Sequence, residues 1–181
     1  MKLILFNGPP GVGKTTLAKK ISSAMPLSFL LDLDRQREFI SHYKKYPEES
    51  RIFSFDIALA IAETCFKNGR DFISGKAMRD IVDKRKGKNQ LDLFIEIGHK
   101  YGAEVHEIFL WADKVTSLKR ADSRGDEKKL RGTVEETNKL FGRYWDEMNT
   151  FKEKRSGAII IDTSKLSPDD VFDRVKNLIK I

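Results

Sequence analysis

The sequence predicts an α/β domain in which helices cover both faces of a mostly parallel sheet. Short β-rich runs alternate with longer segments of helical periodicity along the 181 residues, which is the pattern of βαβ units. A glycine-rich turn follows the first run, and Gly, Asp or Asn stands at or near the end of three others, where open α/β sheets bind ligands. The length suits one domain over 1–181. A composition of 40% hydrophobic and 34% charged residues excludes a natively disordered chain.

Five strands are expected from the β-rich runs. They cover residues 2–7, 28–32, 71–75, 104–111 and 157–162. Residues 52–66 are apolar nearly all round, which indicates a helix that is buried on several sides or roofs a cleft. Thr133 and Glu136 form a capping box before a helix with a near-heptad apolar stripe, which we assign to the core. Another cap at Ser167 starts the last helix.

Composition also limits where the protein acts and what it binds. The longest apolar runs, such as 3–6 and 158–161, are far shorter than the ~20 residues that span a bilayer. The apolar stretch at the N-terminus is too short for the hydrophobic region of a secretory signal. Cys65 is the single cysteine, which excludes an internal disulfide. We therefore expect a cytoplasmic protein without a membrane partner. The net charge of +7 favours anionic partners such as nucleotides, phosphate esters or RNA.

The motif that carries chemistry lies directly after the first strand. Residues 8–15 read G-x-x-x-x-G-K-T and precede a helix, which is the context of a phosphate-binding loop, or P-loop. Its glycines let backbone N–H groups turn toward a phosphate, Lys14 reaches the β- and γ-phosphates, and the Thr15 hydroxyl ligates Mg²⁺. The predicted ligands are therefore ATP and Mg²⁺. The predicted nucleotide-binding residues here are Gly8, Gly11, Val12, Gly13, Lys14, Thr15 and Thr16.

Two carboxylates at the end of the second strand are candidates for the metal and for the base. Residues of a strand that are two apart point the same way, so Asp32 and Asp34 are both expected to face the cleft. Asp32 is predicted to hold Mg²⁺, because the acid that usually follows the third strand is replaced by Ser74-Gly75-Lys76. Asp34 is predicted to accept the proton of an attacking hydroxyl. The alternative is a strand-end turn with two solvated acids.

Arginines supply the remaining predicted contacts. Arg79 is predicted to clamp the substrate, and Gly75 to leave room for it. Arg120 and Arg124 lie four residues apart at the start of a polar segment, so we expect a mobile lid over about 120–132 that closes on the triphosphate. The alternative for each arginine is a solvated surface. Ser164, in the turn after the fifth strand, is expected near the nucleotide base.

These motifs together resemble the small P-loop kinases of the nucleoside monophosphate kinase-like fold. The closest pattern is that of polynucleotide kinases, zeta toxins and chloramphenicol phosphotransferases: Asp34 with Arg37 matches their D-x-x-R, and Arg120 with Arg124 matches their R-x-x-x-R lid. Asp32 and Asp34 also resemble the D-x-D of shikimate kinases, although the triple glycine of those enzymes is absent. The resemblance implies a P-loop NTPase three-layer αβα sandwich with strand order 2-3-1-4-5, Mg-ATP as donor, a hydroxyl or phosphate acceptor, and Arg37 as a substrate-binding residue.

The sequence thus predicts an ATP-dependent phosphotransferase that acts on a hydroxyl of a small molecule or of a nucleoside or nucleotide. The first alternative is a 5′-hydroxyl polynucleotide kinase, favoured by the basic run at 84–88 and disfavoured because no aromatic residues interleave that run. The second is a nucleotide-binding regulatory ATPase, disfavoured by the missing acid after the third strand. The three histidines lack metal-ligand spacing, so no zinc site is expected.

Overall fold

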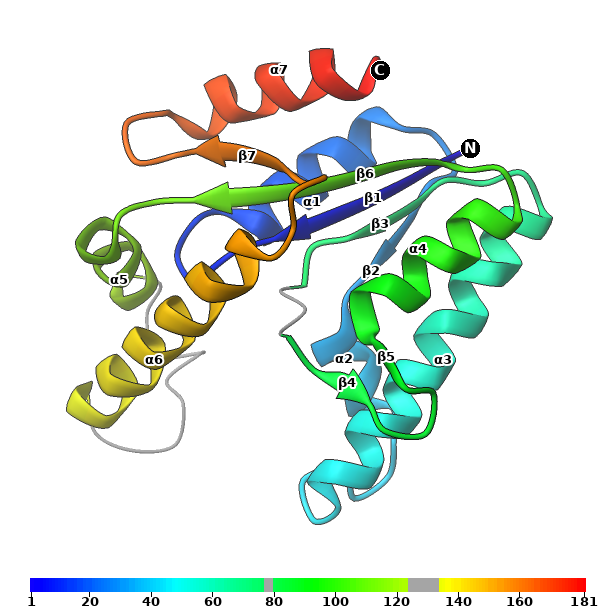
Figure 1. The fold of residues 1–181 in the computed structure, drawn as a ribbon, viewed down its shortest axis with the longest axis horizontal. Helices are drawn as coiled ribbons and strands as arrows, with labels where there is room; N and C mark the ends of the chain where they lie inside the picture. Colours follow the sequence, from blue (N-terminus) through cyan, green and yellow to red (C-terminus); the bar gives the residue numbers. More distant parts are fainter. Residues whose placement is uncertain (77–79, 124–133) are drawn as a thin grey trace.

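A five-stranded parallel sheet forms the centre of the protein, as the sequence predicts (Figure 1). The computed structural model describes residues 1–76, 80–123 and 134–181. Its strands are β1 (Lys2–Asn7), β2 (Phe29–Leu31), β3 (Phe72–Ser74), β6 (Glu104–Trp111) and β7 (Ile159–Asp162). They are arranged β2-β3-β1-β6-β7, with every neighbouring pair parallel. This is the predicted order 2-3-1-4-5, because a separate hairpin takes the labels β4 and β5.

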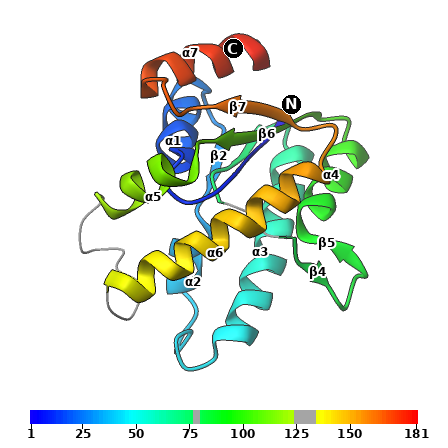
Figure 2. The same ribbon diagram turned by 60° about the vertical axis from the view of Figure 1, so that its left-hand side comes forward.

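Helices cover both faces of the sheet, which gives the three predicted layers (Figure 2). They are α1 (Lys14–Ala24), α2 (Leu33–Glu38), α3 (Pro47–Lys67), α4 (Gln90–Lys100), α5 (Lys114–Asp122), α6 (Val134–Glu153) and α7 (Pro168–Ile179). Ile4 and Phe6 of β1 face a core shared with α1 and α7, whereas Leu3 and Leu5 face one shared with α3, α4 and α6. Burial on both faces explains why β1 is a continuous apolar run. Among the described residues, no helix is both long and apolar enough to cross a membrane.

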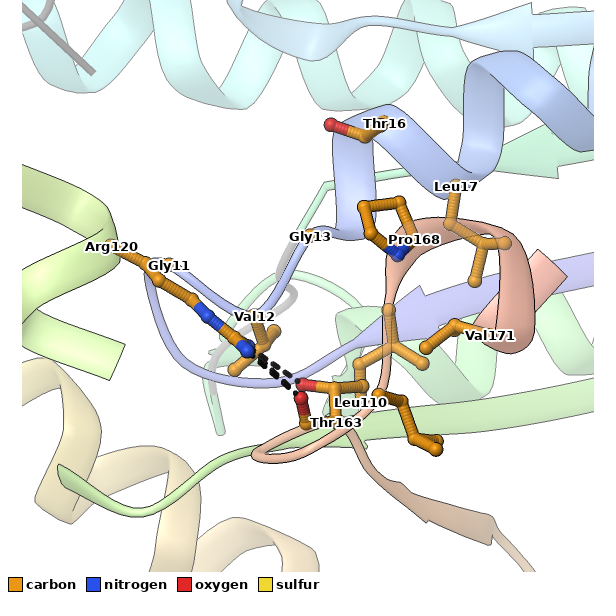
Figure 3. A pocket seen from close by; sticks show the side chains of 11 residues that line it. Gly11, Val12, Gly13, Thr16, Leu17, Leu110, Arg120, Thr163, Pro168 and Val171 are labelled. Carbon is orange, nitrogen blue, oxygen red and sulfur yellow. Dashed lines mark hydrogen bonds between the residues drawn. The ribbon is translucent and has the colours of Figure 1, made fainter. Parts of the chain in front are cut away.

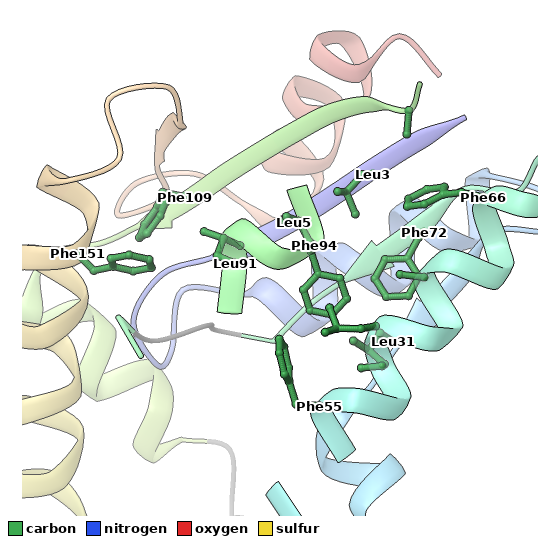
Figure 4. Close-up of a cluster of buried hydrophobic side chains, with 14 of the residues drawn as sticks. Leu3, Leu5, Leu31, Phe55, Phe66, Phe72, Leu91, Phe94, Phe109 and Phe151 are labelled. Atoms are coloured by element: carbon green, nitrogen blue, oxygen red, sulfur yellow. The ribbon is translucent and has the colours of Figure 1, made fainter. Parts of the chain in front are cut away.

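Aromatic side chains fix α3 and α4 on the second face of the sheet (Figure 4). Phe72 of β3 stacks on Phe94 of α4 with a centroid distance of 5.5 Å, and Phe55 of α3 meets Phe94 edge-on at 5.6 Å. All three rings are buried. Offset and edge-on pairs stabilise beyond their buried area, so α3 and α4 are held firmly against β3.

The structure corrects the expected path of the chain after the second strand. β2 ends at Leu31, and Asp32 is the N-cap of α2: its Oδ1 accepts hydrogen bonds from the backbone N–H of Asp34 and Arg35, both at 3.2 Å. A capping carboxylate satisfies otherwise unpaired amides and starts a helix. The prediction that Asp32 and Asp34 extend from one strand is therefore wrong, because Asp34 lies in the first turn of a helix.

Helices α3 and α6 differ in part from their predicted burial. α3 buries a single face, whereas Phe53 on another side is 56% exposed, so it is not buried on several sides. Its N-terminal half lines a cavity, which fits the alternative of a helix over a cleft. In α6, Met148 and Phe151 are buried as predicted, and the described aromatic residues before them are half-buried. The capping residue Thr133 and the side chain of Val134 lie outside the described residues. The sequence did not predict α2 or the antiparallel hairpin of β4 (Val82–Asp83) and β5 (Lys88–Asn89).

Two contacts tie α6 to the rest of the fold. Trp145 of α6 lies 4.5 Å from Trp111 at the end of β6, between ring centroids, and its Nε1 donates to the carbonyl of Ala112 at 3.1 Å. Just after α6, Arg155 forms a half-buried brace: its Nε and Nη2 donate to the buried Glu107 carboxylate at 2.8 and 2.7 Å, and its Nη1 to the more exposed Asp92 at 2.6 Å. The Glu107 hydrogen bonds, with Asp92 adding to them, raise the pKa of Arg155 above its ordinary value.

Candidate active site

The P-loop has the backbone geometry that its glycines predict. Gly8, Gly11 and Gly13 have φ angles of 129°, 84° and 93°, a region that L side chains rarely adopt. A Cβ on Gly8 would lie 2.0 Å from the carbonyl oxygen of Leu110, and one on Gly11 would lie 2.0 Å from that of Ser117. These close approaches explain why glycine is needed at both positions.

Polar groups of the P-loop and of the first turn of α1 gather where the loop meets the helix. Lys14 Nζ donates to the carbonyl oxygens of Gly8 at 2.8 Å and Pro9 at 2.6 Å, so the ammonium lies over the loop. Gly13 is the N-cap of α1 and provides no side-chain cap. The hydroxyls of Thr15 and Thr16 are exposed and make no hydrogen bond with the described residues. Uncapped amides, an ammonium and a hydroxyl fit a triphosphate with Mg²⁺.

A cavity of about 160 Å³ opens beside the P-loop, toward β7 (Figure 3). It is lined by Gly11, Val12, Gly13, Thr16, Leu17, Leu110, Arg120, Thr163, Leu166, Pro168 and Val171. Its wall is mostly apolar with a few polar groups, which is how sites for flat heterocycles are built. The P-loop forms one side of this cavity. The position of the cavity therefore suits the base of a nucleotide whose phosphates lie on the loop.

Arg120 contacts the turn that the sequence placed near the base. Its Nη1 and Nη2 donate to the carbonyl oxygen of Thr163, both at 3.1 Å, and Nη2 also donates to that of Ser164 at 3.1 Å. The structure therefore brings Arg120 and Ser164 together. The Ser164 hydroxyl accepts from the backbone N–H of Asp113 at 3.2 Å, so its neighbour Thr163 lines the cavity instead.

Sequence reasoning missed Ser117, which joins α5 to the P-loop. Ser117 is buried, and its Oγ donates to the carbonyl oxygen of Pro10. One turn later on the same helix, Arg120 holds the 163–164 turn. Helix α5 thus links the P-loop to the 163–164 turn, on two sides of the same cavity. A serine inside a polar helical segment carries no sequence signal for such a contact.

A second cavity, of about 430 Å³, lies on the other side of the P-loop strand, between α2 and α3. It is lined by Leu33, Asp34, Arg37, Glu48, Arg51, Ser54, Phe55, Lys76, Ile81 and Gln90. Lys76 Nζ lies 2.6 Å from both carboxylate oxygens of Asp34. The structure therefore brings the predicted Asp34 and Arg37 into one cavity and adds Lys76, which the sequence did not single out as a functional residue.

Two predictions agree less well with the structure: Asp32 as a ligand of Mg²⁺, and space for the substrate at Gly75. Asp32 uses Oδ1 to cap α2, and within residues 1–76, 80–123 and 134–181 no three His, Cys, Asp or Glu side chains cluster as metal ligands. Asp32 as a ligand of Mg²⁺ therefore stays a prediction. A Cβ on Gly75 would lie 2.8 Å from the Cβ of Ala18. Gly75 thus allows β3 to approach α1, and the expectation that it leaves room for substrate is wrong.

Residues 3–143 match a family model described as an AAA domain, AAA_33. The chain belongs to this family. The match includes the P-loop, helices α2 and α3 that line the second cavity, and helix α5. It agrees with the predicted resemblance to small P-loop kinases, which is confirmed for the fold. None of the curated proteins matches the chain.

Solved structures similar to this AAA-domain chain span nearly its whole length. A sugar kinase from Janibacter sp. HTCC2649 has a TM-score of 0.65 at 14% identity, covering 100% of this chain and 95% of its own. A tunicamycin resistance protein from Deinococcus radiodurans has 0.59 at 16%, covering 100% and 97%. A deoxyadenosine kinase from M. mycoides has 0.53 at 16%, covering 99% of each. At these identities the likeness shows the fold.

Two predicted residues of this AAA domain lie outside the described part of the chain. Arg79 and Arg124 fall within 77–79 and 124–133, as does most of the predicted lid over 120–132. The structure does not test their roles, so both stay predictions.

Proposed function

We propose that this AAA-domain protein is an ATP-dependent kinase that transfers the γ-phosphate to a hydroxyl of a small molecule, nucleoside or nucleotide. One observation carries the proposal: two cavities lie at the same edge of the sheet, on either side of the P-loop strand β1. The cavity toward β7 suits a nucleotide base, and the other presents the carboxylate of Asp34. A kinase needs a second site of this kind, with a carboxylate in it, to hold the acceptor hydroxyl.

Each residue then has a defined task. Lys14 and the loop amides hold the triphosphate, and Thr15, with Asp32, would hold Mg²⁺, which neutralises charge on the phosphates. Asp34 takes the proton from the acceptor hydroxyl. The hydroxyl oxygen of the acceptor then bonds to the γ-phosphorus, and the bond between the γ-phosphorus and the bridging oxygen of the β-phosphate breaks, which releases ADP. Arg37 and Arg79 position the acceptor.

Arg120 is proposed to act on the base side of the nucleotide, because its hydrogen bonds hold the 163–164 turn. Arg124 keeps its proposed task of closing over the triphosphate from the lid. The two arginines of the R-x-x-x-R pattern would then divide base binding from phosphate binding. The likeness to solved kinases of a sugar and of deoxyadenosine supports this reading of the fold, and the single cysteine supports a cytoplasmic location.

The alternative of a polynucleotide kinase loses support from the basic run at 84–88. Arg85 pairs with Asp56 and Asp83, both at 2.7 Å, and Lys86 pairs with Asp56 at 3.0 Å. Lys88 pairs with a glutamate of α4. The acids beside this run lower its net positive charge and so its attraction to a phosphate backbone, which makes a small acceptor the better proposal.

The experiment is ADP release from Mg-ATP across a panel of hydroxylated acceptors. We expect at least one acceptor to raise turnover about 100-fold over water, and Asp34→Asn to lower that turnover about 100-fold or more while ATP binding is unchanged. Glu38→Gln, which removes an exposed acid of the same helix, serves as the matched control. Full turnover in Asp34→Asn would remove Asp34 from the mechanism, and tight ATP binding with no active acceptor would refute the kinase.

A further inference from the structure

The charged side chains around the acceptor cavity do not balance. Three cations and two carboxylates line it. Arg51 pairs with Glu48 at 2.6 Å, and Lys76 pairs with Asp34 at 2.6 Å. Among the described residues, Arg37 has no carboxylate within ion-pair distance. The cavity wall therefore carries one positive charge in excess.

Arg37 is only weakly satisfied by its surroundings. Its Nη2 lies 3.3 Å from the Ser50 hydroxyl and 3.4 Å from the carbonyl oxygen of Pro47, both at the long limit of a hydrogen bond. Its Nη1 donates to no described residue, and its Nε is buried without a partner there. A half-buried guanidinium in this state gains from an added anion, because hydrogen bonds to charged groups are the strong ones.

A second unsatisfied donor lies in the same wall. Ser54 of α3 lines the cavity and is 1% exposed, and its Oγ has no hydrogen-bond partner among the described residues. The backbone carbonyl of Ser54 accepts from Gln36 of α2 at 3.0 Å, which keeps this part of α3 close to Arg37. A buried hydroxyl without a partner is destabilising, so a ligand that bonds it is favoured.

Lys76 limits access to the proposed base. Its Nζ lies 2.6 Å from both oxygens of Asp34, which a hydroxyl must reach in order to lose its proton there. The pair is solvent-exposed, with 39% of the Lys76 side chain and 65% of the Asp34 side chain accessible, and such pairs exchange partners at little cost. An anion bound next to Lys76 would attract the ammonium and expose the carboxylate.

We infer that the acceptor carries an anionic group, a carboxylate or a phosphate, beside the hydroxyl that receives the phosphoryl group. Arg37 binds that group, Ser54 donates to it, and Lys76 moves from Asp34 to the ligand. Arg37 and Ser54 select the ligand, and Lys76 links anion binding to exposure of the base. This inference rests on the proposed function for the identity of the cavity as an acceptor site.

The test compares neutral and anionic acceptors that are built on the same carbon skeleton. The sets are glycerol, glycerate and glycerol 3-phosphate; glucose, gluconate and glucose 6-phosphate; and adenosine with adenosine 5′-monophosphate. Binding of each compound to the full chain is measured by calorimetry without ATP, and binding of an ATP analogue is measured separately. We expect an anionic member of at least one set to bind at least 10-fold more tightly than its neutral member.

Variants of the cavity then assign the effect. Arg37→Gln and Lys76→Met should each weaken binding of the anionic compound about 10-fold or more, weaken binding of the neutral compound by a clearly smaller factor, and leave the ATP analogue unaffected. Arg37→Lys keeps the charge and should recover part of the affinity. Arg174→Gln and Lys176→Met, on the exposed side of α7, remove the same charges far from the cavity and should change nothing.

Each outcome separates this inference from the proposed function. If the neutral member binds as well as its charged partners in every set, or if no member binds, the anionic acceptor is wrong. The kinase proposal fails independently, if ATP binds but no acceptor is phosphorylated. A carboxylate and a phosphate are told apart by which member of the set binds more tightly. A loss of affinity in the Arg174 or Lys176 variants equal to that in the cavity variants would also overturn the inference.

Discussion

Arg155 tests how strongly the cation that faces a buried carboxylate, Glu107, stabilises this fold. The Arg155 side chain is 16% exposed and that of Glu107 is 9% exposed, and three hydrogen bonds of 2.6–2.8 Å join Arg155 to Glu107 and Asp92. Replacing Arg155 by Met keeps most of the apolar stem but leaves the Glu107 carboxylate buried without its cation. Removing one partner of a buried pair costs about 3–5 kcal/mol. For a chain of this length, the midpoint of thermal unfolding should fall by about 6–20 °C.

The neighbouring residue provides a matched control. Lys154 also lies at the end of α6 and pairs with Asp80 at 2.6 Å, but 60% and 38% of the two side chains are exposed. An exposed pair of the same length contributes about 0–1 kcal/mol, so Lys154→Met should change little. Both variants are measured by urea unfolding followed by circular dichroism.

A double variant separates the loss of the pair from other effects of the substitution. Because the cost arises from an uncompensated carboxylate, Glu107→Gln added to Arg155→Met should recover at least half of the lost free energy of unfolding. Equal losses in the Arg155 and Lys154 variants would refute the argument from burial. Additive losses in the double variant would show that Glu107 and Arg155 do not act as a pair.

Three further predictions concern the site and one surface contact. Gly11→Ala should abolish binding of a fluorescent ATP analogue, because its Cβ would lie 2.0 Å from a carbonyl oxygen of α5. Arg120→Gln should raise the Kd for ATP and ADP alike by about 10-fold or more, since it removes the hydrogen bonds to the base-side turn and not a contact to the γ-phosphate. Hydrogen bonds led by that from Lys100 lower the pKa of Glu63 from 4.5 to about 2, so their stabilisation is complete above about pH 4.5 and is lost toward pH 2. An NMR titration of the Glu63 carboxyl should show this midpoint, and Lys100→Met should raise it.

Each of these predictions has a contradicting result. Gly87→Ala has a φ of 64° and no atom within 4 Å of the added Cβ, so it controls for backbone strain alone; equal loss of nucleotide binding there would refute the steric argument. A fall in kcat with unchanged affinity for ADP would place Arg120 at the phosphates. A Glu63 midpoint that is the same with and without Lys100 would remove the ion pair as its cause.

The parts of the fold that repeat a simple pattern could be predicted from the sequence. The P-loop and the alternation of strands and helices followed from a spaced motif and from alternating apolar segments, because backbone geometry at glycines and burial on two faces leave direct marks in the sequence. The strand order came from the resemblance to small P-loop kinases. The strand ends could not be placed as well. Asp32 looks like the last residue of a strand, but its carboxylate caps a helix, and only the three-dimensional path of the backbone distinguishes these two roles.

The contacts between distant segments were not predictable from one sequence. Lys76 reaches Asp34 across 42 residues, and Ser117 reaches Pro10 across 107. Lysine and serine are ordinary surface residues, so nothing in their local sequence marks such partners. The tasks of Arg120 and Arg124 were predicted together because they share a helical face, whereas the structure gives Arg120 a position at the base-side turn.

The paired indoles at the end of β6 give the protein a built-in optical probe. Trp111 and Trp145 are the two tryptophans of the chain, and their rings lie 4.5 Å apart with 46° between their planes. Two chromophores this close couple their electronic transitions, so they should produce a paired band of opposite signs in the circular dichroism spectrum. Because Trp145 belongs to α6, any rotation of that helix against the sheet alters the band. Movement at this junction during turnover can therefore be followed in the unlabelled protein.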